Sequence, residues 1–189
     1  MGLTPLAGLP GATRSGSVDP SLIFHFTHDA GLLAPGMTKD MHITQAEEIL
    51  NKRSGWQVLT GTTNFGEVLR RAGEGDGECQ LAVDLFVDRV LGFVGSYFVK
   101  LDGQVDALVF AGGIGEKGVE VRRRIVEGVR CLGFEIDEKR NEEVGKGGVV
   151  EEIGYQRPGK VGKKVLVVKT DEQLEMARGC AREFIAMEK

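Results

Sequence analysis

Residues 106–118 read Asp-Ala-Leu-Val-Phe-Ala-Gly-Gly-Ile-Gly-Glu-Lys-Gly. The apolar run at 107–111 is typical of a buried β-strand, and three glycines follow it within four positions. A helical pattern comes next, with one apolar face formed by Val119, Ile125, Val129 and Leu132. A strand that passes through glycines into a helix leaves bare backbone beside free N–H groups, which small anions and flat nucleosides can approach closely. The stretch therefore predicts a nucleotide site.

The composition is that of an ordinary globular domain. The chain has 189 residues, 41% hydrophobic and 28% charged, which suits one domain or one large half of a two-domain enzyme. The formal net charge of −4 argues against a nucleic-acid partner, because phosphate backbones require a basic surface. The sequence shows no membrane span or signal-peptide pattern. Cys79, Cys131 and Cys180 are far apart, so we expect reduced thiols in a cytoplasmic protein without membrane contacts.

A second strand and helix repeat this arrangement near the end of the chain. Residues 163–168 predict a buried strand, and Thr170 with Gln173 matches the capping box of a final helix. The inner face of that helix is expected to hold Leu174, Ala177, Ala181 and Phe184 or Ile185. The pattern predicts an α/β fold. Because ligands on such sheets bind at the carboxyl ends of the strands, we expect Gly112 to Lys117 and Thr170 to Glu172 to face one cleft.

Helices dominate the predictions for the first hundred residues. Residues 1–20 are rich in Gly, Pro, Ser and Thr and are expected to form a loop. Thr44, three residues before Glu47, matches the start of a helix. The longest helical signal spans 78–100, with an apolar stripe that we expect in the core: Leu81, Leu85, Phe86, Val90, Phe93, Val94, Tyr97 and Phe98.

Other segments give less regular signals. Residues 56–59 predict a short strand or extended piece, followed by a polar turn and a helix capped by Thr63 or Asn64. Residues 133–137 predict another short strand. The polar, glycine-containing residues 139–148 predict a short helix and an exposed loop.

One arginine in the first loop stands between hydroxyl side chains. The segment Thr13-Arg14-Ser15-Gly16 presents a planar guanidinium whose donors suit carboxylate or phosphate oxygens. From this segment alone, a solvated arginine or an ion pair with Asp19 is the better interpretation.

The glycines after the central strand allow two interpretations. Gly113-x-Gly115-x-x-Gly118 satisfies the dinucleotide fingerprint, and Glu135 or Asp137 lies about 20 residues further on, where an acid would hold the ribose of NAD. This interpretation predicts the NAD-binding half of a dehydrogenase. Against it, the fingerprint normally opens a domain, whereas here a long helix precedes it. The alternative is a kinase-type cradle in which the glycine backbone lies against adenosine.

Four stretches resemble one protein family, and they occur along this chain in the same order as in that family. They are residues 105–116 (Val-Asp-Ala-Leu-Val-Phe-Ala-Gly-Gly-Ile-Gly-Glu) with 120–124, residues 1–6 with 13–16, residues 50–55 (Leu-Asn-Lys-x-Ser-Gly), and residues 170–174 (Thr-Asp-Glu-x-Leu). Together they resemble acetate kinase, of the actin, Hsp70 and sugar-kinase group. The resemblance implies the ribonuclease-H-like second domain of that fold, with a mixed sheet and helices on its faces. It further implies that residues 1–189 are a single domain, the C-terminal nucleotide-binding half, with the N-terminal half absent.

The resemblance also implies a reaction and roles for individual residues. Acetate kinase transfers a phosphoryl group from ATP to acetate, reversibly, giving acetyl phosphate and ADP with Mg²⁺. Such a transfer requires positioning and countercharge on the moving group rather than a protein nucleophile. Arg14 would be the catalytic residue that stabilises the charged transition state, and Glu172 would help to hold Mg²⁺ through water. The ATP or ADP contacts would come from Gly113, Ile114, Gly115, Glu116, Lys117, Asn64, Phe65 and Gly66.

The chain departs from the family pattern in several places. Asn64 and Gly66 stand where the family has an acid and an arginine, and Lys117 stands where it usually has asparagine, which leaves nucleotide preference open. The first half of the family, with its phosphate loop and acetate pocket, has no counterpart here. The resemblance implies a homodimer, and we expect the chain alone to bind ADP weakly without turnover. A non-catalytic nucleotide-binding remnant is the third possibility.

Overall fold

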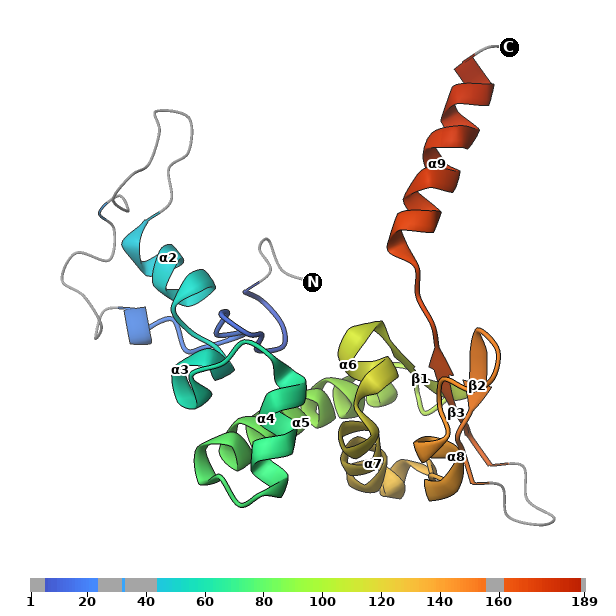
Figure 1. Ribbon diagram of the computed structural model, residues 1–189, viewed down its shortest axis with the longest axis horizontal. Helices are drawn as coiled ribbons and strands as arrows, with labels where there is room; N and C mark the ends of the chain where they lie inside the picture. Colours follow the sequence, from blue (N-terminus) through green and yellow to red (C-terminus); the bar gives the residue numbers. More distant parts are fainter. Residues whose placement is uncertain (1–5, 24–31, 33–43, 156–161, 188–189) are drawn as a thin grey trace. The chain divides into compact units, whose positions relative to one another are not determined.

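The computed structural model describes residues 6–23, 32, 44–155 and 162–187. The chain divides into two compact units, Met1–Lys100 and Leu101–Lys189, which are treated separately below (Figure 1). Within the described residues, no helix has the length and apolar character needed to cross a membrane.

Unit 1 is helical, and side-chain caps begin two of its helices. The Thr44 hydroxyl accepts a hydrogen bond from the Glu47 amide at 3.2 Å. The Asn64 side-chain oxygen accepts from the amides of Gly66 and Glu67 at 3.0 and 3.3 Å. Both caps satisfy first-turn N–H groups that lack partners within the helix, which confirms the predicted helix starts. The helices are α2(Gln45–Lys52), α3(Trp56–Thr60), α4(Phe65–Gly73) and α5(Gly77–Lys100).

The strand predicted at 56–59 is wrong, because these residues form α3. The first two amides of α3 donate to loop carbonyls, those of Gly11 and Ala12, at 3.2 and 3.0 Å. Gly55 begins the helix with φ of 73°, and a Cβ there would overlap the Gly11 carbonyl oxygen. Tertiary acceptors and one glycine therefore favour a helical turn that local sequence does not indicate.

Three aromatic rings form the core of unit 1. The Trp56 ring lies 4.7 Å from that of Phe65 and 6.1 Å from that of Phe86, measured between centroids, and the two phenylalanine rings are 5.1 Å apart. All three residues are at most 8% exposed. Tilted and edge-on contacts at these distances are the favourable geometry for aromatic pairs. The cluster joins α3, α4 and α5.

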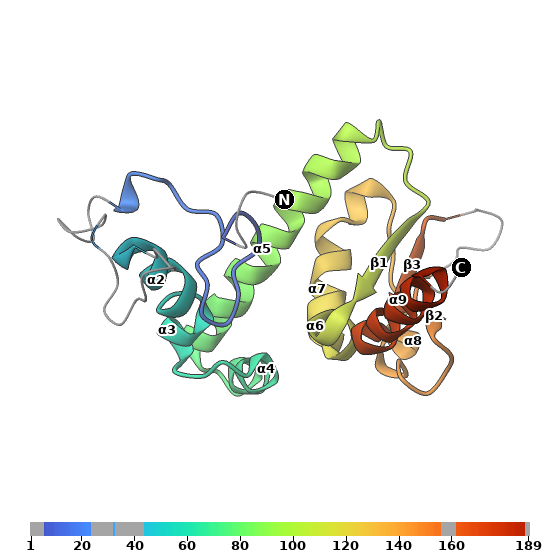
Figure 2. The same ribbon diagram turned by 90° about the horizontal axis from the view of Figure 1, so that it is seen from above.

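The apolar stripe predicted on α5 is only partly correct. The helix itself is confirmed, yet its buried side chains all lie in its first half, at Cys79, Ala82, Val83, Phe86 and Val87. Leu81, Leu85, Phe93 and Tyr97 are 36–54% exposed. Figure 2 shows α3 and α4 beside the first half of α5. Periodicity identifies apolar positions, but it does not tell how much of the helix a neighbour covers.

Unit 2 is built on a mixed sheet of three strands in its described residues, in the order β1-β3-β2. β1(Ala107–Ala111) and β3(Lys164–Val168) pair in parallel, and β2(Val150–Glu152) pairs antiparallel with β3. The strands predicted at 107–111 and 163–168 are thus confirmed. The helical elements of unit 2 are α6(Gly112–Lys117), α7(Val119–Gly128), η1(Arg130–Leu132), α8(Glu138–Glu142) and α9(Glu172–Met187).

Helices α6 and α7 lie on one side of this sheet (Figures 1 and 2). Phe110 and Val167 are register partners in the parallel pair and are 8% and 1% exposed. Val109, which alternates to the opposite face, is 51% exposed, so β1 is buried on one face only. The predicted face of the following helix is wrong at Val119, which is 37% exposed. The buried residues of that region are Val121, Arg122, Ile125, Val126 and Val129.

Three further predictions for unit 2 concern short elements. The strand predicted at 133–137 is wrong, because this segment makes only an isolated bridge between Ile136 and Gly154. The short helix predicted within 139–148 is confirmed as α8. Strand β2 was not predicted, since its Val-Glu-Glu sequence has no apolar alternation.

The final helix is confirmed, but its cap and its inner face differ from the prediction. The Asp171 side chain, rather than Thr170, caps α9 by accepting from the Leu174 amide at 2.9 Å. The predicted inner face is exposed, with Leu174 at 45% and Phe184 at 67%. In Figure 1, α9 leaves the end of β3 without lying against the sheet.

The aromatic cluster gives a prediction for stability. Replacing Phe65 by Ala is expected to lower the free energy of unfolding of unit 1 by about 3–5 kcal/mol, because it leaves a cavity beside two rings. Trp56 is the single tryptophan of the chain, so its fluorescence during urea unfolding reports this unit. Val58→Ala is the control, since Val58 is 65% exposed and its loss should cost under about 0.5 kcal/mol. Equal effects of the two substitutions would contradict the cluster's role.

Candidate functional site

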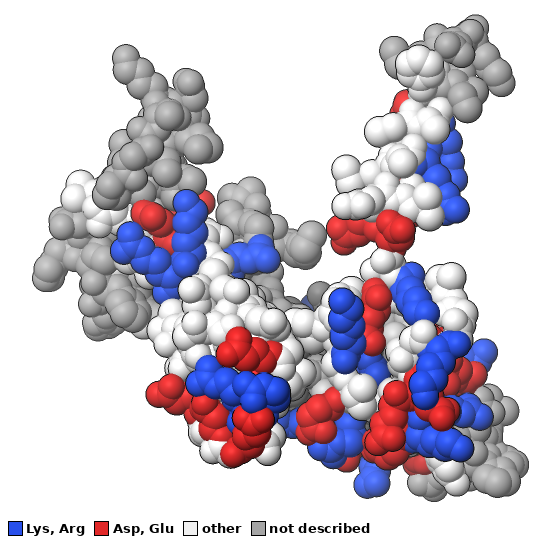
Figure 3. Space-filling model, in the orientation of Figure 1, with Lys and Arg blue, Asp and Glu red and all other residues white. Residues whose placement is uncertain are grey.

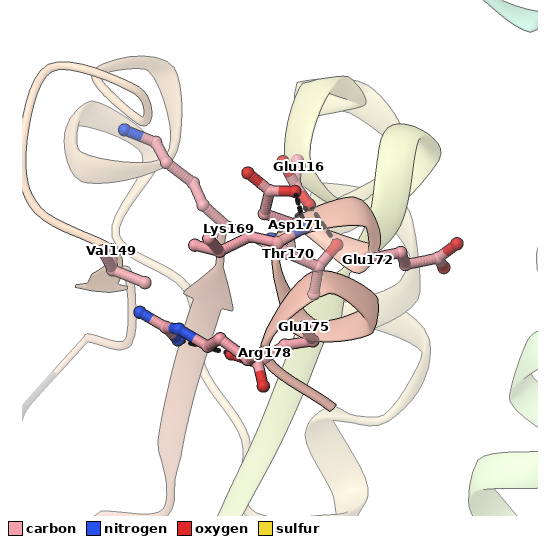
Figure 4. Close-up of a pocket in the computed structure, with 9 residues that line it drawn as sticks. Glu116, Val149, Lys169, Thr170, Asp171, Glu172, Glu175 and Arg178 are labelled. Carbon is pink, nitrogen blue, oxygen red and sulfur yellow. Dashed lines mark hydrogen bonds and ion pairs between the residues drawn. The ribbon is translucent and has the colours of Figure 1, made fainter. Parts of the chain in front are cut away.

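Two polar turns meet at one edge of the sheet in unit 2. Ala111 at the end of β1 pairs with Val168 at the end of β3, so the turns that follow begin at the same level. A pocket of about 820 Å³ opens there (Figure 4), a size typical of small-molecule sites. The expectation that the two turns face one cleft is confirmed in part: residues 170–172 line this pocket, and Glu116 is the residue of the first turn that does so. The pocket is lined by Glu116, Val149, Lys169, Thr170, Asp171, Glu172, Leu174, Glu175 and Arg178.

The carboxylate of Glu116 connects the two turns. One of its oxygens accepts hydrogen bonds from the Thr170 amide at 3.0 Å, the Thr170 hydroxyl at 2.9 Å and the Gly112 amide at 3.1 Å. The hydrogen bonds from Thr170, and then that from Gly112, lower the pKa of Glu116 below its ordinary value, because they favour the charged form. The Thr170 hydroxyl, predicted to cap α9, is engaged here instead. Glu116 therefore links the two turns by hydrogen bonds and lines the pocket between them.

The glycines of the first turn differ in what a side chain would disturb. Gly112 has φ of 70°, which a side chain would strain. A Cβ on Gly118 would lie 2.6 Å from the Ile114 carbonyl oxygen, and one on Gly115 would lie 3.3 Å from the Phe110 backbone. Gly113 has neither constraint, since its φ is ordinary and an added Cβ would meet no atom within 4 Å. Its backbone is exposed at the first turn of α6, where a flat ligand can approach.

The charges around the pocket are mixed. Figure 3 shows acidic side chains at the start of α9 and basic ones further along it. Arg178 pairs with Glu175 at 2.5 Å, and Lys169 lies 3.7 Å from Glu151. The Glu172 carboxylate extends away from Lys169 and is exposed (Figure 4). The described residues contain no cluster of three potential metal ligands. The Mg²⁺ role of Glu172 stays a prediction.

Comparison with known families matches residues 1–178 to the Acetokinase family. The chain belongs to this family. It is 52% identical over 183 residues to a probable acetate kinase of Emericella nidulans, covering 96% of this chain and 43% of that protein. Among solved structures, acetate kinase of Porphyromonas gingivalis matches with a TM-score of 0.76 and 31% identity, over 95% of this chain and 41% of that one. A propionate kinase of Francisella tularensis matches with a TM-score of 0.73 and 34% identity, over 92% and 40%.

These matches confirm the predicted fold and set its extent. The chain has the acetokinase fold of the actin, Hsp70 and sugar-kinase group, here a small mixed sheet flanked by helices. It spans less than half the length of the relatives it matches. The family match extends through both units, and it does not favour the dehydrogenase interpretation.

Arg14 lies in the first loop of this acetokinase-family chain, and backbone contacts hold the loop in place. The amide of Ser15 donates to the Leu50 carbonyl at 2.9 Å, and the amide of Ser54 donates to the Thr13 carbonyl at 2.9 Å. The Arg14 side chain itself is exposed. The loop is thus fixed on both sides of Arg14 while the guanidinium remains accessible to a ligand.

The three predicted contacts at 64–66 have structural duties of their own. Asn64 caps α4, and the ring of Phe65 is 7% exposed within the aromatic cluster. Gly66 is exposed beside the cap, where a Cβ would lie 3.2 Å from the Asn64 oxygen. The nucleotide contacts predicted at this turn stay a prediction.

The predicted site residues therefore fall into two groups. Arg14 and residues 64–66 belong to unit 1, whereas residues 113–117 and Glu172 belong to unit 2. Glu116 and Glu172 line the same pocket, while Lys117 is exposed on α6. The convergence of the two groups on one nucleotide stays a prediction.

Sequence reasoning missed two buried polar residues behind the first turn. Arg122 and Asn141 are each 0% exposed, and their side chains contact each other. Arg122 is the first of three consecutive arginines, and nothing in such a run indicates which one is buried.

The hydrogen bonds to the Glu116 carboxylate predict that the stability of the fold depends on pH. Because the pKa of Glu116 is lowered by folding, its stabilising contribution is present above its ordinary value of 4.5 and is lost as the pH falls through the lowered value. Glu116→Gln should therefore lower the thermal midpoint, followed by circular dichroism, near pH 7, and the difference from the wild type should shrink toward about pH 3.

Glu142→Gln provides the matched control, because Glu142 is exposed on α8. Its midpoint should follow that of the wild type at each pH. A difference for Glu116→Gln that persists unchanged into acid would show that the charge of this carboxylate does not stabilise the turn.

Proposed function

We propose that this chain is the C-terminal, nucleotide-binding part of an acetate kinase, which transfers a phosphoryl group between ATP and acetate and produces acetyl phosphate and ADP. Two lines support the proposal: membership of the Acetokinase family and relatives named acetate kinase. The structural observation that carries it is the exposed, side-chain-free backbone of Gly113 in the same short helix as Glu116, which lines a pocket at the carboxyl ends of β1 and β3. Such a surface suits the flat face of adenosine.

The proposed roles follow the chemistry of phosphoryl transfer. Arg14, fixed in its loop, supplies countercharge to the transferred group, and Glu172 binds Mg²⁺ through water. In unit 2, ATP or ADP lies along residues 113–117. Asn64 and Gly66 of unit 1 are proposed as further nucleotide contacts. The Phe65 ring supports that turn from the core, and Lys117 contributes a cation at the edge of the nucleotide. We propose acetate as the acyl substrate because the sequence relatives are named acetate kinases. One solved relative is a propionate kinase, so propionate is the alternative substrate to compare.

The assembly and compartment belong to the same proposal. A homodimer accounts for the exposed apolar residues on α5, such as Leu81 and Tyr97, which a second copy would cover. The cysteines Cys79, Cys131 and Cys180 are free, which agrees with a reducing compartment such as the cytoplasm.

A substitution at Gly113 tests the nucleotide site without disturbing the fold. Gly113→Ala adds a methyl group that meets no protein atom, and alanine favours helices over glycine by about 0.8–1.0 kcal/mol, so stability should not fall. The methyl would separate adenosine from the backbone and weaken ADP binding by about tenfold or more, a loss of about 1.4 kcal/mol. Isothermal titration with ADP and Mg²⁺ measures the affinity.

Gly179→Ala is the matched control, since Gly179 also lies in a helix with no atom near an added Cβ. It should leave the ADP affinity unchanged. Titration with NAD separates the alternatives, because binding of NAD in preference to ADP would favour a dehydrogenase half. If the chain bound neither ADP nor NAD, the result would favour a remnant without a nucleotide site.

Activity of the chain alone gives a second test. Because the chain spans less than half the length of its relatives, we expect the chain alone to yield no acetyl phosphate from ATP and acetate, measured as the hydroxamate. Arg14→Ala is the control for contaminating enzymes. Activity that survives in Arg14→Ala reports a contaminant, whereas activity that Arg14→Ala abolishes would contradict the half-enzyme proposal and support the role of Arg14.

A further inference from the structure

Arg122 on α7 is a fully buried arginine. Its Nε donates to the Asn141 side-chain oxygen at 2.7 Å, and one terminal nitrogen donates to the Asn141 carbonyl at 2.8 Å. The other terminal nitrogen donates to the carbonyls of Gly115 and Glu116, both at 2.8 Å. The residue is 0% exposed. All three guanidinium nitrogens are thus directed at fixed oxygen acceptors.

A cation in this position is costly for the fold. Burial lowers the pKa of Arg122, and the negative charge of Glu151 acts in the opposite direction. The four acceptors named above are three backbone carbonyls and one amide oxygen, so each hydrogen bond is made to a neutral group. An apolar side chain of similar volume would avoid the desolvation of a charge. The position therefore indicates that the groups held by Arg122 matter more than the packing it provides.

The groups held by Arg122 lie at the end of α6. The last four carbonyls of any helix lack partners within it, and α6 has only six residues. The Gly118 amide donates a hydrogen bond to the Ile114 carbonyl at 2.8 Å. The Arg122 side chain donates to the next two carbonyls, those of Gly115 and Glu116. The Asn141 side chain donates to the Val119 carbonyl at 3.1 Å, which holds the start of α7. Arg122 and Asn141 together anchor the junction between α6 and α7 to α8.

Fixing one end of so short a helix also fixes the other. The opposite end of α6 carries the exposed Gly113 backbone, and the Glu116 side chain reaches from the anchored end to the Gly112 amide at 3.1 Å. With Arg122 behind α6 and Thr170 in front of it, the turn is held between two sets of hydrogen bonds. A pre-ordered turn binds a ligand without the entropic cost of ordering loops on binding.

We propose that Arg122 is a positioning residue for nucleotide binding, which anchors the α6 carbonyls so that the backbone at 113–115 is preformed for adenosine. The proposal deepens the proposed function and rests on it. Arg122 does not touch the nucleotide in this arrangement, since its donors are directed at the far end of α6.

The test compares two conservative substitutions on the same helix. Arg122→Lys keeps the charge and most of the stem but loses the planar fork that reaches separate acceptors. Arg123→Lys is the matched control, because Arg123 makes ion pairs with Glu120 and Glu127 on the surface of α7. The measurements are amide hydrogen exchange of the nucleotide-free chain, resolved by residue, and ADP affinity by calorimetry.

In Arg122→Lys, the amides of residues 112–117 should exchange at least about tenfold faster, while those of β3 remain protected. ADP affinity should fall by about tenfold, because part of the binding free energy is then spent on ordering the turn. Arg123→Lys should change neither quantity. The expected signature is thus local loosening with weaker binding in one variant alone.

Three results would overturn the inference. Exchange at 112–117 that matches Arg123→Lys would show that Arg122 does not anchor the turn. Faster exchange spread equally over β3 would show a general structural role. Local loosening with unchanged ADP affinity would show that the anchor does not serve binding. Absence of ADP binding by the unsubstituted chain would instead contradict the proposed function, while the exchange data would still decide whether the anchor exists.

Discussion

The parallel pairing of β1 with β3 determines where the candidate site lies. Parallel neighbours end at the same edge of a sheet, so the turn after Ala111 and the turn after Val168 are adjacent although 57 positions separate these partners in the numbering. Adjacency alone leaves two independent loops. The hydrogen bonds from Gly112 and Thr170 to the Glu116 carboxylate convert them into one unit. The Glu116 side chain thus connects two turns that the parallel strand pairing brings together.

The same turn also depends on polar groups that the core of unit 2 encloses. A short helix with glycines has little intrinsic stability, because nucleation is costly and glycine favours the unfolded chain. Arg122 supplies partners for two of its carbonyls, and Glu116 supplies one for the Gly112 amide. Asn141 holds the Val119 carbonyl at the start of the next helix. The turn is thus stable through tertiary hydrogen bonds and not through its own sequence. Glycine can then be used where a ligand needs bare backbone.

Local sequence predicted the elements whose signals are local and missed those set by distant groups. The caps at Thr44 and Asn64 and the strand at 107–111 follow from residues within a few positions of one another. By contrast, α3 receives its acceptors from a loop more than forty residues away, and the Thr170 hydroxyl finds Glu116 across 54 positions. These partners are visible only in the folded chain.

The candidate site shows the same division. The sequence predicted that the turns after the strands at 107–111 and 163–168 face one cleft, and Glu116 and residues 170–172 do line one pocket. The burial of Arg122 could not be predicted, because Arg122, Arg123 and Arg124 are chemically identical and differ only in the direction they face. Likewise, the α5 stripe was correct as a list of apolar positions and wrong as a buried face, since burial depends on the neighbours.

The exposed apolar residues of both units bear on the extent of the protein. Every described side chain of α9 is exposed, including Leu174, Met176 and Phe184. An isolated helix of this length is marginal in water, where most helical stability comes from packing an apolar face. The relatives are more than twice as long as the part of them that this chain matches. The exposed faces of α9 and of the second half of α5 are the surfaces that further parts of a longer protein or a second copy would cover under the proposed function.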